Sequence, residues 1–81
     1  IMSYELTKEE ENKKILYWIS RTVASKKDIR AKELDHDATF GELGVDGYLI
    51  RQEVNEFFNV EVPDNLNTTN KLRDYFKDWP L

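Results

Sequence analysis

The sequence predicts an all-α protein, a bundle of three to four helices with a long ordered loop between the first two. Apolar residues recur at helical spacing in three separate segments, residues 15–23, 50–58 and 72–79. A residue suited to capping a helix precedes each segment. Only residues 58–63 alternate apolar and polar side chains, and they have no partner strand elsewhere in the chain. We therefore expect helices packed on helices.

The first helix is expected from about Lys8 to about Ser25. Before it, Thr7-Lys8-Glu9-Glu10 is a capping-box pattern, in which the Thr7 hydroxyl accepts from the Glu10 backbone N–H and the Glu10 carboxylate reaches back. Acidic residues in the first turns and basic residues near the end match the helix dipole. The apolar stripe of this helix comprises Ile15, Leu16, Ile19 and Val23, flanked by Trp18 and Thr22.

Residues 28–46 lose the helical period and form the expected long loop. A structureless connection of this length is uncommon in a small domain. Four apolar residues are spaced so that their side chains can pack in the core and order the loop, and the charged residues between them stay in water. These four anchors are Ile29, Leu34, Phe40 and Leu43.

The second helix is expected from Gly47 or Tyr48 to Phe58, with Asp46 as its N-cap. Its buried stripe has the spacing i, i+4, i+7 and i+8, and comprises Ile50, Val54, Phe57 and Phe58. All three glycines of the chain lie between positions 41 and 47, just before this helix.

The rest of the chain predicts a connector and one more helix. Residues 58–63 form an extended connector, and residues 64–66 form a turn or a short third helix. Asn67-Thr68-Thr69 then offers N-caps for the last helix. We expect its buried side to comprise Leu72, Tyr75, Phe76 and Trp79, and Pro80 to end it.

Length and composition limit the function. The 81 residues predict one domain, about residues 7–79, after a loose tail at residues 1–6. The net charge of −4 disfavours nucleic acid as a partner. The absence of cysteine favours a cytoplasmic address and excludes thiolate chemistry. No apolar run approaches the roughly 18 residues that a membrane span needs.

Catalytic and metal-binding residues are not expected. His36 lies between Asp35 and Asp37, but an isolated Asp-His-Asp is seldom a metal site without further ligands. No pattern pairs two carboxylates for acid–base work, and the glutamates at 9–11 are most simply surface charge near a helix N-terminus. The sequence therefore predicts a protein that is not an enzyme.

The residues around the glycines resemble the signature of acyl and peptidyl carrier proteins. Phe40-x-x-Leu43-Gly44-x-Asp46, followed by an apolar-periodic helix, is similar to that signature. Before it, residues 34–40 resemble the family's loop. After it, three further elements stand in the family's order, namely Val62-Pro63, Thr68-Thr69 and Asp74-Tyr75-Phe76. The resemblance covers about residues 7–79 and implies a bundle of acyl-carrier-protein type.

The chain departs from that family at the residue after the Asp. In the family this residue is the serine that bears the phosphopantetheine arm, and here it is Gly47. Attachment requires a hydroxyl to attack the phosphoryl group of coenzyme A, and glycine has none. The remaining serines, Ser3, Ser20 and Ser25, lie in or before the first helix. We expect no cofactor, phosphopantetheine included, unless Gly47 replaces a serine.

The second departure is length. Sixteen positions separate Gly47 from Pro63. Similar carriers have about 19 from the serine to that proline, so about one helical turn is missing. A Ser→Gly replacement made by design would leave the helix at full length, so the shortening favours natural divergence. The chain is also similar to small bacterial carrier-like proteins in which Gly follows the Asp.

The sequence is compatible with three functions. The first is an atypical carrier-like protein without the attachment serine, which acts by protein–protein docking or regulation in fatty-acid, polyketide or nonribosomal-peptide metabolism. The second is a working acyl or peptidyl carrier whose serine at position 47 has been substituted. The third is an unrelated small helical adaptor, in which the glycines serve only turn geometry.

A docking face is implied by the resemblance, because carriers use an acidic second helix to meet basic patches on partner enzymes. We expect a monomer whose corresponding face comprises Asp46, Tyr48, Arg51, Gln52, Asn55 and Glu56. Glu53 adds a further acid, whereas Arg51 and the amides dilute the negative field. A solvated helix face without a partner is the alternative. Tyr48 is expected in the core or at its rim, or over the spot that an arm would leave.

Overall fold

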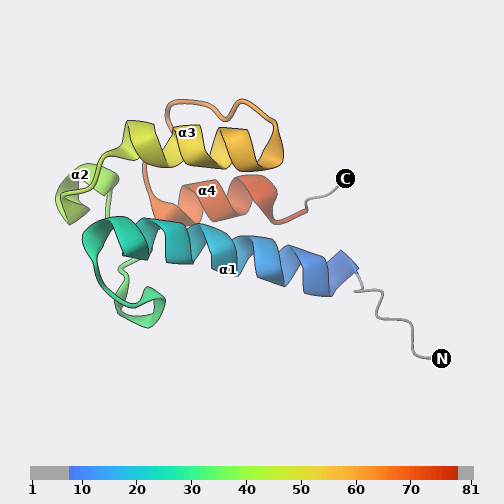
Figure 1. Ribbon diagram of the computed structural model, residues 1–81, viewed down its shortest axis with the longest axis horizontal. Coiled ribbons are helices and arrows are strands. Elements are labelled where there is room, and N and C mark those ends of the chain that lie inside the picture. The colour runs from blue at the N-terminus through green and yellow to red at the C-terminus, as the bar shows by residue number, and fades with distance from the viewer. Residues whose placement is uncertain (1–7, 79–81) are drawn as a thin grey trace.

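The structure, a computed structural model, describes residues 8–78 (Figure 1). Its elements are α1 (Lys8–Lys27), η1 (Ala31–Glu33), α2 (Phe40–Leu43), α3 (Gly47–Phe58) and α4 (Thr69–Phe76). Within residues 8–78 the β-type pairing is confined to one isolated bridge, between Thr39 and Thr68. The all-α prediction is confirmed.

Some predictions concern residues outside the described range. They are the tail at residues 1–6, the Thr7 cap, the buried Trp79 and the helix stop at Pro80. Of the helices within residues 8–78, none is both long enough and apolar enough to cross a membrane.

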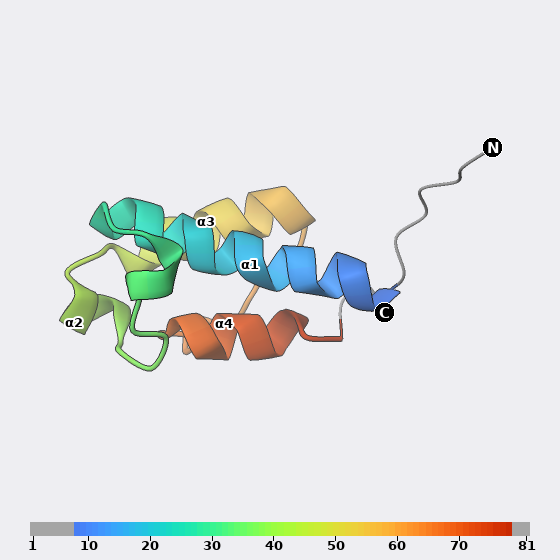
Figure 2. The same ribbon diagram turned by 90° about the horizontal axis from the view of Figure 1, so that it is seen from below.

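α1 is the longest helix, and the other elements are arranged along it (Figure 1). It contacts α4, η1 and α3. When the molecule is turned, α3 and α4 lie above and below α1 (Figure 2). Each of these two helices therefore buries its apolar stripe toward α1.

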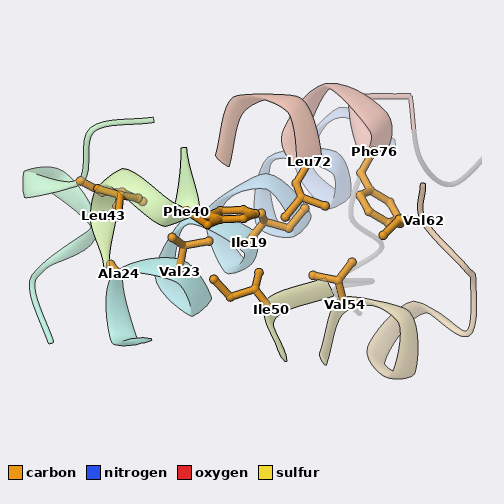
Figure 3. Packing of buried hydrophobic residues seen from close by; sticks show 11 residues of the cluster. Ile19, Val23, Ala24, Phe40, Leu43, Ile50, Val54, Val62, Leu72 and Phe76 are labelled. Atoms are coloured by element: carbon orange, nitrogen blue, oxygen red, sulfur yellow. The ribbon is translucent and has the colours of Figure 1, made fainter. Parts of the chain in front are cut away.

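One core joins the helices. Figure 3 shows its side chains pointing toward one another from α1, α2, α3 and α4. Six residues at its centre are fully buried: Ile19, Val23, Ile50, Val54, Leu72 and Phe76. Ile15, Leu16 and Phe58 pack against it while partly exposed. The predicted stripes of α1, α3 and α4 are confirmed at these positions.

Two predicted core residues are exposed instead. Phe57 is 61% exposed and Tyr75 is 45% exposed, so both predictions of burial are wrong. The ring of Phe57 stacks on Trp18 with the centroids 4.2 Å apart, outside the core. Each residue has a neighbouring phenylalanine about 100° around the helix that takes the inner position instead: Phe58 packs against the core, and Phe76 lies in it.

The connection between α1 and α3 is ordered by its apolar anchors. Leu34, Phe40 and Leu43 are buried and Ile29 packs against the core, as predicted. The connection also contains η1 and α2, two short helices that the sequence analysis did not predict. Each is too short to repeat a helical period, so periodicity cannot reveal it.

Hydrogen bonds tie this connection to the start of α4. The Phe40 N–H donates to the Asn67 carbonyl at 2.9 Å, and the Asn70 N–H donates to the His36 carbonyl at 3.0 Å. The Asn70 side chain also donates to the Asp37 carboxylate. The middle of the connection is therefore held to the start of α4.

Candidate functional site

The N-terminus of α3 is the candidate site that the sequence singled out. Asp46 caps the helix, because its Oδ1 accepts from the Leu49 N–H at 3.2 Å. This confirms the predicted N-cap role. Asp46 is exposed.

Gly47 is packed against a buried side chain. A Cβ atom added at Gly47 would stand 2.8 Å from Cδ2 and 3.3 Å from Cβ of Phe40. It would also stand 3.2 Å from a guanidinium nitrogen of Arg51. Because Phe40 is only 3% exposed, its ring has little room to withdraw. A Cβ atom at position 47 would therefore force Phe40 or the start of α3 to shift.

Two rows of side chains make up the outward face of α3. Residues i, i+4 and i+8 share one line on a helix. The first row is Tyr48, Gln52 and Glu56, and the second is Leu49, Glu53 and Phe57; all six are exposed. Tyr48 is 62% and Leu49 51% exposed, so Tyr48 is not in the core. We call these six residues the α3 face.

Two of the predicted docking residues lie at the edge of this face. Asn55 is half-buried, and its Oδ1 accepts from the Val62 N–H at 2.9 Å, so it holds the connector after α3. Arg51 is also half-buried and reaches back over Gly47. The structure therefore brings together Tyr48, Gln52 and Glu56, and gives Asn55 a structural role.

Leu49 and Phe57 are members of the α3 face that the sequence analysis did not assign to docking. Leu49 follows Tyr48 and Phe57 follows Glu56. A rotation of 100° per residue keeps Leu49 and Phe57 on the outward side of the helix. The stripe of Ile50 and Val54 on the opposite side of the helix was the signal that could have revealed them.

Contacts with α1 border the α3 face on one side. Lys26 forms a 2.8 Å ion pair with Glu53, and Trp18 stacks on Phe57. A shallow hollow runs along this border, lined by Trp18, Thr22, Ser25, Lys26, Glu53, Glu56 and Phe57. The α3 face therefore combines apolar side chains, acids and an adjoining depression.

Among residues 8–78 no group of three or more His, Asp or Glu side chains could hold a metal ion. Both ring nitrogens of His36 are engaged inside the protein, with Ser20 Oγ at 2.9 Å and the Leu34 carbonyl at 3.1 Å.

No protein-family model, curated protein or solved structure matches this chain.

Proposed function

We propose that the protein is a carrier-type interaction module that has no phosphopantetheine arm and docks partner proteins through the α3 face. It is not an enzyme in this proposal. The resemblance implies partners among the enzymes of fatty-acid, polyketide or nonribosomal-peptide assembly, or a protein that they regulate. The docking surface centres on Tyr48, Leu49, Gln52 and Glu56, with Asp46 and Arg51 at its edge.

The observation that carries the proposal is the gathering of exposed apolar side chains on one helix. Five large hydrophobic residues are exposed within residues 8–78, and three of them belong to α3: Tyr48, Leu49 and Phe57. Grouped exposed apolar side chains with a polar rim are typical of protein–protein contact sites. Tyrosine and phenylalanine are also enriched in such interfaces.

The packing at Gly47 supports a role without an arm. An attachment serine must present its hydroxyl to solvent and to a transferase. A Cβ at position 47 would instead meet the Phe40 ring, which is buried. This contact favours a natural glycine over a carrier whose serine was replaced, because the core around it is shaped to a residue without a side chain.

The connection before α3 supports the carrier-type bundle over an unrelated adaptor. The resemblance expects Leu34, Phe40 and Leu43 to turn inward, and an adaptor with the glycines in a plain turn does not require it. All three are buried. An unrelated adaptor remains the second candidate, since its exposed α3 face would also bind a protein.

The charge of the α3 face indicates the chemistry of the partner. Glu53 and Glu56 lie on it and Asp46 stands at its start, whereas Arg51 lies at the edge and Lys26 is paired with Glu53. The face is therefore weakly acidic around an apolar centre. A complementary partner surface carries lysine or arginine around an apolar hollow.

The proposal is tested by titrating the ¹⁵N-labelled chain with a ketosynthase from fatty-acid assembly and recording amide chemical shifts. Shift changes concentrated on residues 46–57 are expected. The variant Tyr48→Ala/Glu56→Lys should weaken binding by about tenfold or more, because it removes an exposed aromatic anchor and reverses a charge. The control Tyr75→Ala/Glu11→Lys makes the same chemical changes at exposed residues of α4 and α1.

Equal weakening by the two variants, or shifts spread over α1 and α4, would contradict docking through the α3 face. Absence of binding to any carrier-recognising enzyme would instead favour the unrelated adaptor.

A further inference from the structure

A second surface, separate from the α3 face, is a groove between α1, the segment that follows it, and α4. Its volume is about 1010 Å³, and α3 contributes none of its lining residues. Sites for cofactors and other small ligands commonly have roughly 300–1,000 Å³. The groove is therefore large enough for a nucleotide-sized molecule.

Positive charge is concentrated in this groove. Its lining contains five basic residues, Lys13, Arg21, Arg30, Lys32 and Arg73, and a single acidic residue, Asp28. The whole chain carries −4 and the groove lining +4, so the other side chains together carry −8. The groove is thus a positively charged region on a protein that is otherwise acidic.

None of these five basic residues forms an ion pair with an acidic residue in the described part of the chain. Within residues 8–78 the ion pair that the structure contains, between Lys26 and Glu53, lies outside the groove. Arg73 is half-buried, and its Nε–H is buried without a hydrogen-bond acceptor in the described part of the chain. A buried donor without an acceptor costs free energy, and Arg73 lines the groove, so a shift of its side chain toward a bound anion would satisfy this donor.

Neutral hydrogen-bonding groups also line the groove, on Ser20 and His36. The Leu34 carbonyl can only accept, so His36 in its neutral form carries its proton on Nδ1 and donates it to that carbonyl. Nε2 then accepts from the Ser20 hydroxyl at 2.9 Å. These two hydrogen bonds hold the His36 ring against α1, so its position in the lining of the groove is fixed.

An aromatic ring and aliphatic side chains complete the lining. Tyr17 is 58% exposed, and the Arg21 guanidinium lies 5.9 Å from the centre of its ring. Leu16, Ile29 and Ala31 add apolar surface beside it. A ligand with both a charged end and a flat apolar part would match these two kinds of surface.

We propose that this groove binds a small organic phosphate that carries an aromatic ring, such as a nucleoside diphosphate. Three of the five cations are arginines, whose planar guanidinium groups match phosphate oxygens in a bidentate geometry. The ring stacks on Tyr17 at the edge of the groove. A compact anion is favoured over nucleic acid, because the charge of −8 outside the groove repels an extended phosphate backbone.

Calorimetric titration of the 81-residue chain at fixed salt tests the proposal, with ADP, pyrophosphate and adenosine as probes. ADP is expected to bind more tightly than pyrophosphate, and adenosine not to bind measurably. The variant Arg21→Gln/Lys32→Gln should weaken ADP binding by about tenfold or more, since it removes two charge-assisted contacts. The matched control Lys14→Gln/Lys77→Gln removes the same charge at exposed positions outside the groove.

Tyr17→Ala separates stacking from general attraction of anions. It should weaken binding of ADP several-fold and leave binding of pyrophosphate unchanged, because pyrophosphate has no ring. The proposal is overturned if ADP shows no saturable binding below about 1 mM. Equal weakening in the groove variant and in its control would overturn it too, and so would displacement of ADP by hexaglutamate at equal concentration, which indicates an acidic peptide.

Discussion

At the scale of single residues, the close packing of Phe40 explains why position 47 holds a glycine. A Cβ at position 47 would stand 2.8 Å from the Phe40 ring, whereas a Cβ at Gly41 would meet nothing closer than 3.9 Å. Gly47→Ala is therefore expected to lower the free energy of unfolding by about 1–3 kcal/mol through overpacking. The matched control Gly41→Ala should raise it by about 0.5–1 kcal/mol. Urea denaturation of both variants measures the difference, and equal effects would contradict the close packing at Gly47.

Glu42 is a residue whose titration the structure alters. The Thr39 backbone N–H donates to its carboxylate at 2.8 Å and the Thr39 hydroxyl contributes as well, so the pKa of Glu42 is lowered from its ordinary value of 4.5. A group whose pKa is lower in the folded state stabilises the protein above its unfolded pKa. That contribution is lost as the pH falls below 4.5 through the folded pKa.

A carboxyl titration followed by NMR should therefore give Glu42 a pKa below 4.5. In the Glu42→Gln variant the free energy of unfolding should depend less on pH below 4.5, because glutamine has no carboxyl group that binds a proton in this range. A Glu42 pKa at or above 4.5 would show that the capping box with Thr39 does not form in solution.

At the scale of elements, three helices end in the same way. Asp28 follows α1, Gly44 follows α2 and Asn59 follows α3, each with a positive φ, at 61°, 75° and 54°. The next residue then donates its N–H to a carbonyl five positions earlier, as Val60 does to Asn55. These apolar next residues, Ile29, Val45 and Val60, pack against the core. Each helix end is thereby closed by a Schellman-type turn.

Substitution at these ends should follow the cost of the left-handed conformation. Gly44→Ala is expected to lower the free energy of unfolding by about 1–2 kcal/mol, because alanine is strained at positive φ. Asn59→Gly should raise it by less than about 1 kcal/mol, since glycine has no such strain. Thermal unfolding of the two variants checks the opposite signs. Stabilisation by Gly44→Ala would contradict the turn after α2.

Capping and periodicity account for the elements that could be predicted. Asp46 and Thr68 cap α3 and α4 as expected, since a side-chain acceptor before an apolar period is a local signal. η1 and α2 were missed because they contain three and four residues, too few to repeat a helical period, although Thr39 and Glu42 form a local capping box at the start of α2. The end of α3 at Phe58 was predicted, but the left-handed conformations of Asp28 and Asn59 were not, because neither residue is glycine.

At the scale of the whole molecule, stability depends on the core between α1, α3 and α4. Phe76 is fully buried in it, and its ring lies 4.6 Å from that of Phe58. Phe76→Ala is expected to lower the free energy of unfolding by about 3–5 kcal/mol. The neighbouring Tyr75→Ala changes an exposed ring and should cost under about 1 kcal/mol. Guanidinium denaturation compares them, and similar costs would contradict the burial of Phe76.

The candidate site could be predicted in part. Helical spacing from Tyr48 to Glu56 gave one row of the α3 face, because a single helix orders its own side chains. The exposure of Phe57 was missed because Phe57 and Phe58 both fit the apolar period, and Phe58 is the one that packs against the core. The basic groove also escaped prediction, because Lys13, Lys32 and Arg73 come from three segments that meet only in the folded chain.

Phosphopantetheinylation of a Gly47→Ser variant tests most directly whether the start of α3 is closed to an arm. The variant should stay folded, since an overpacking cost of about 1–3 kcal/mol is smaller than the 5–15 kcal/mol of a typical domain. Circular dichroism confirms its helices before it is incubated with coenzyme A and a promiscuous transferase, beside a known carrier as control. Intact-mass spectrometry is expected to find the control modified and the variant unchanged. Efficient mass gain on the serine at position 47 would contradict the closed site.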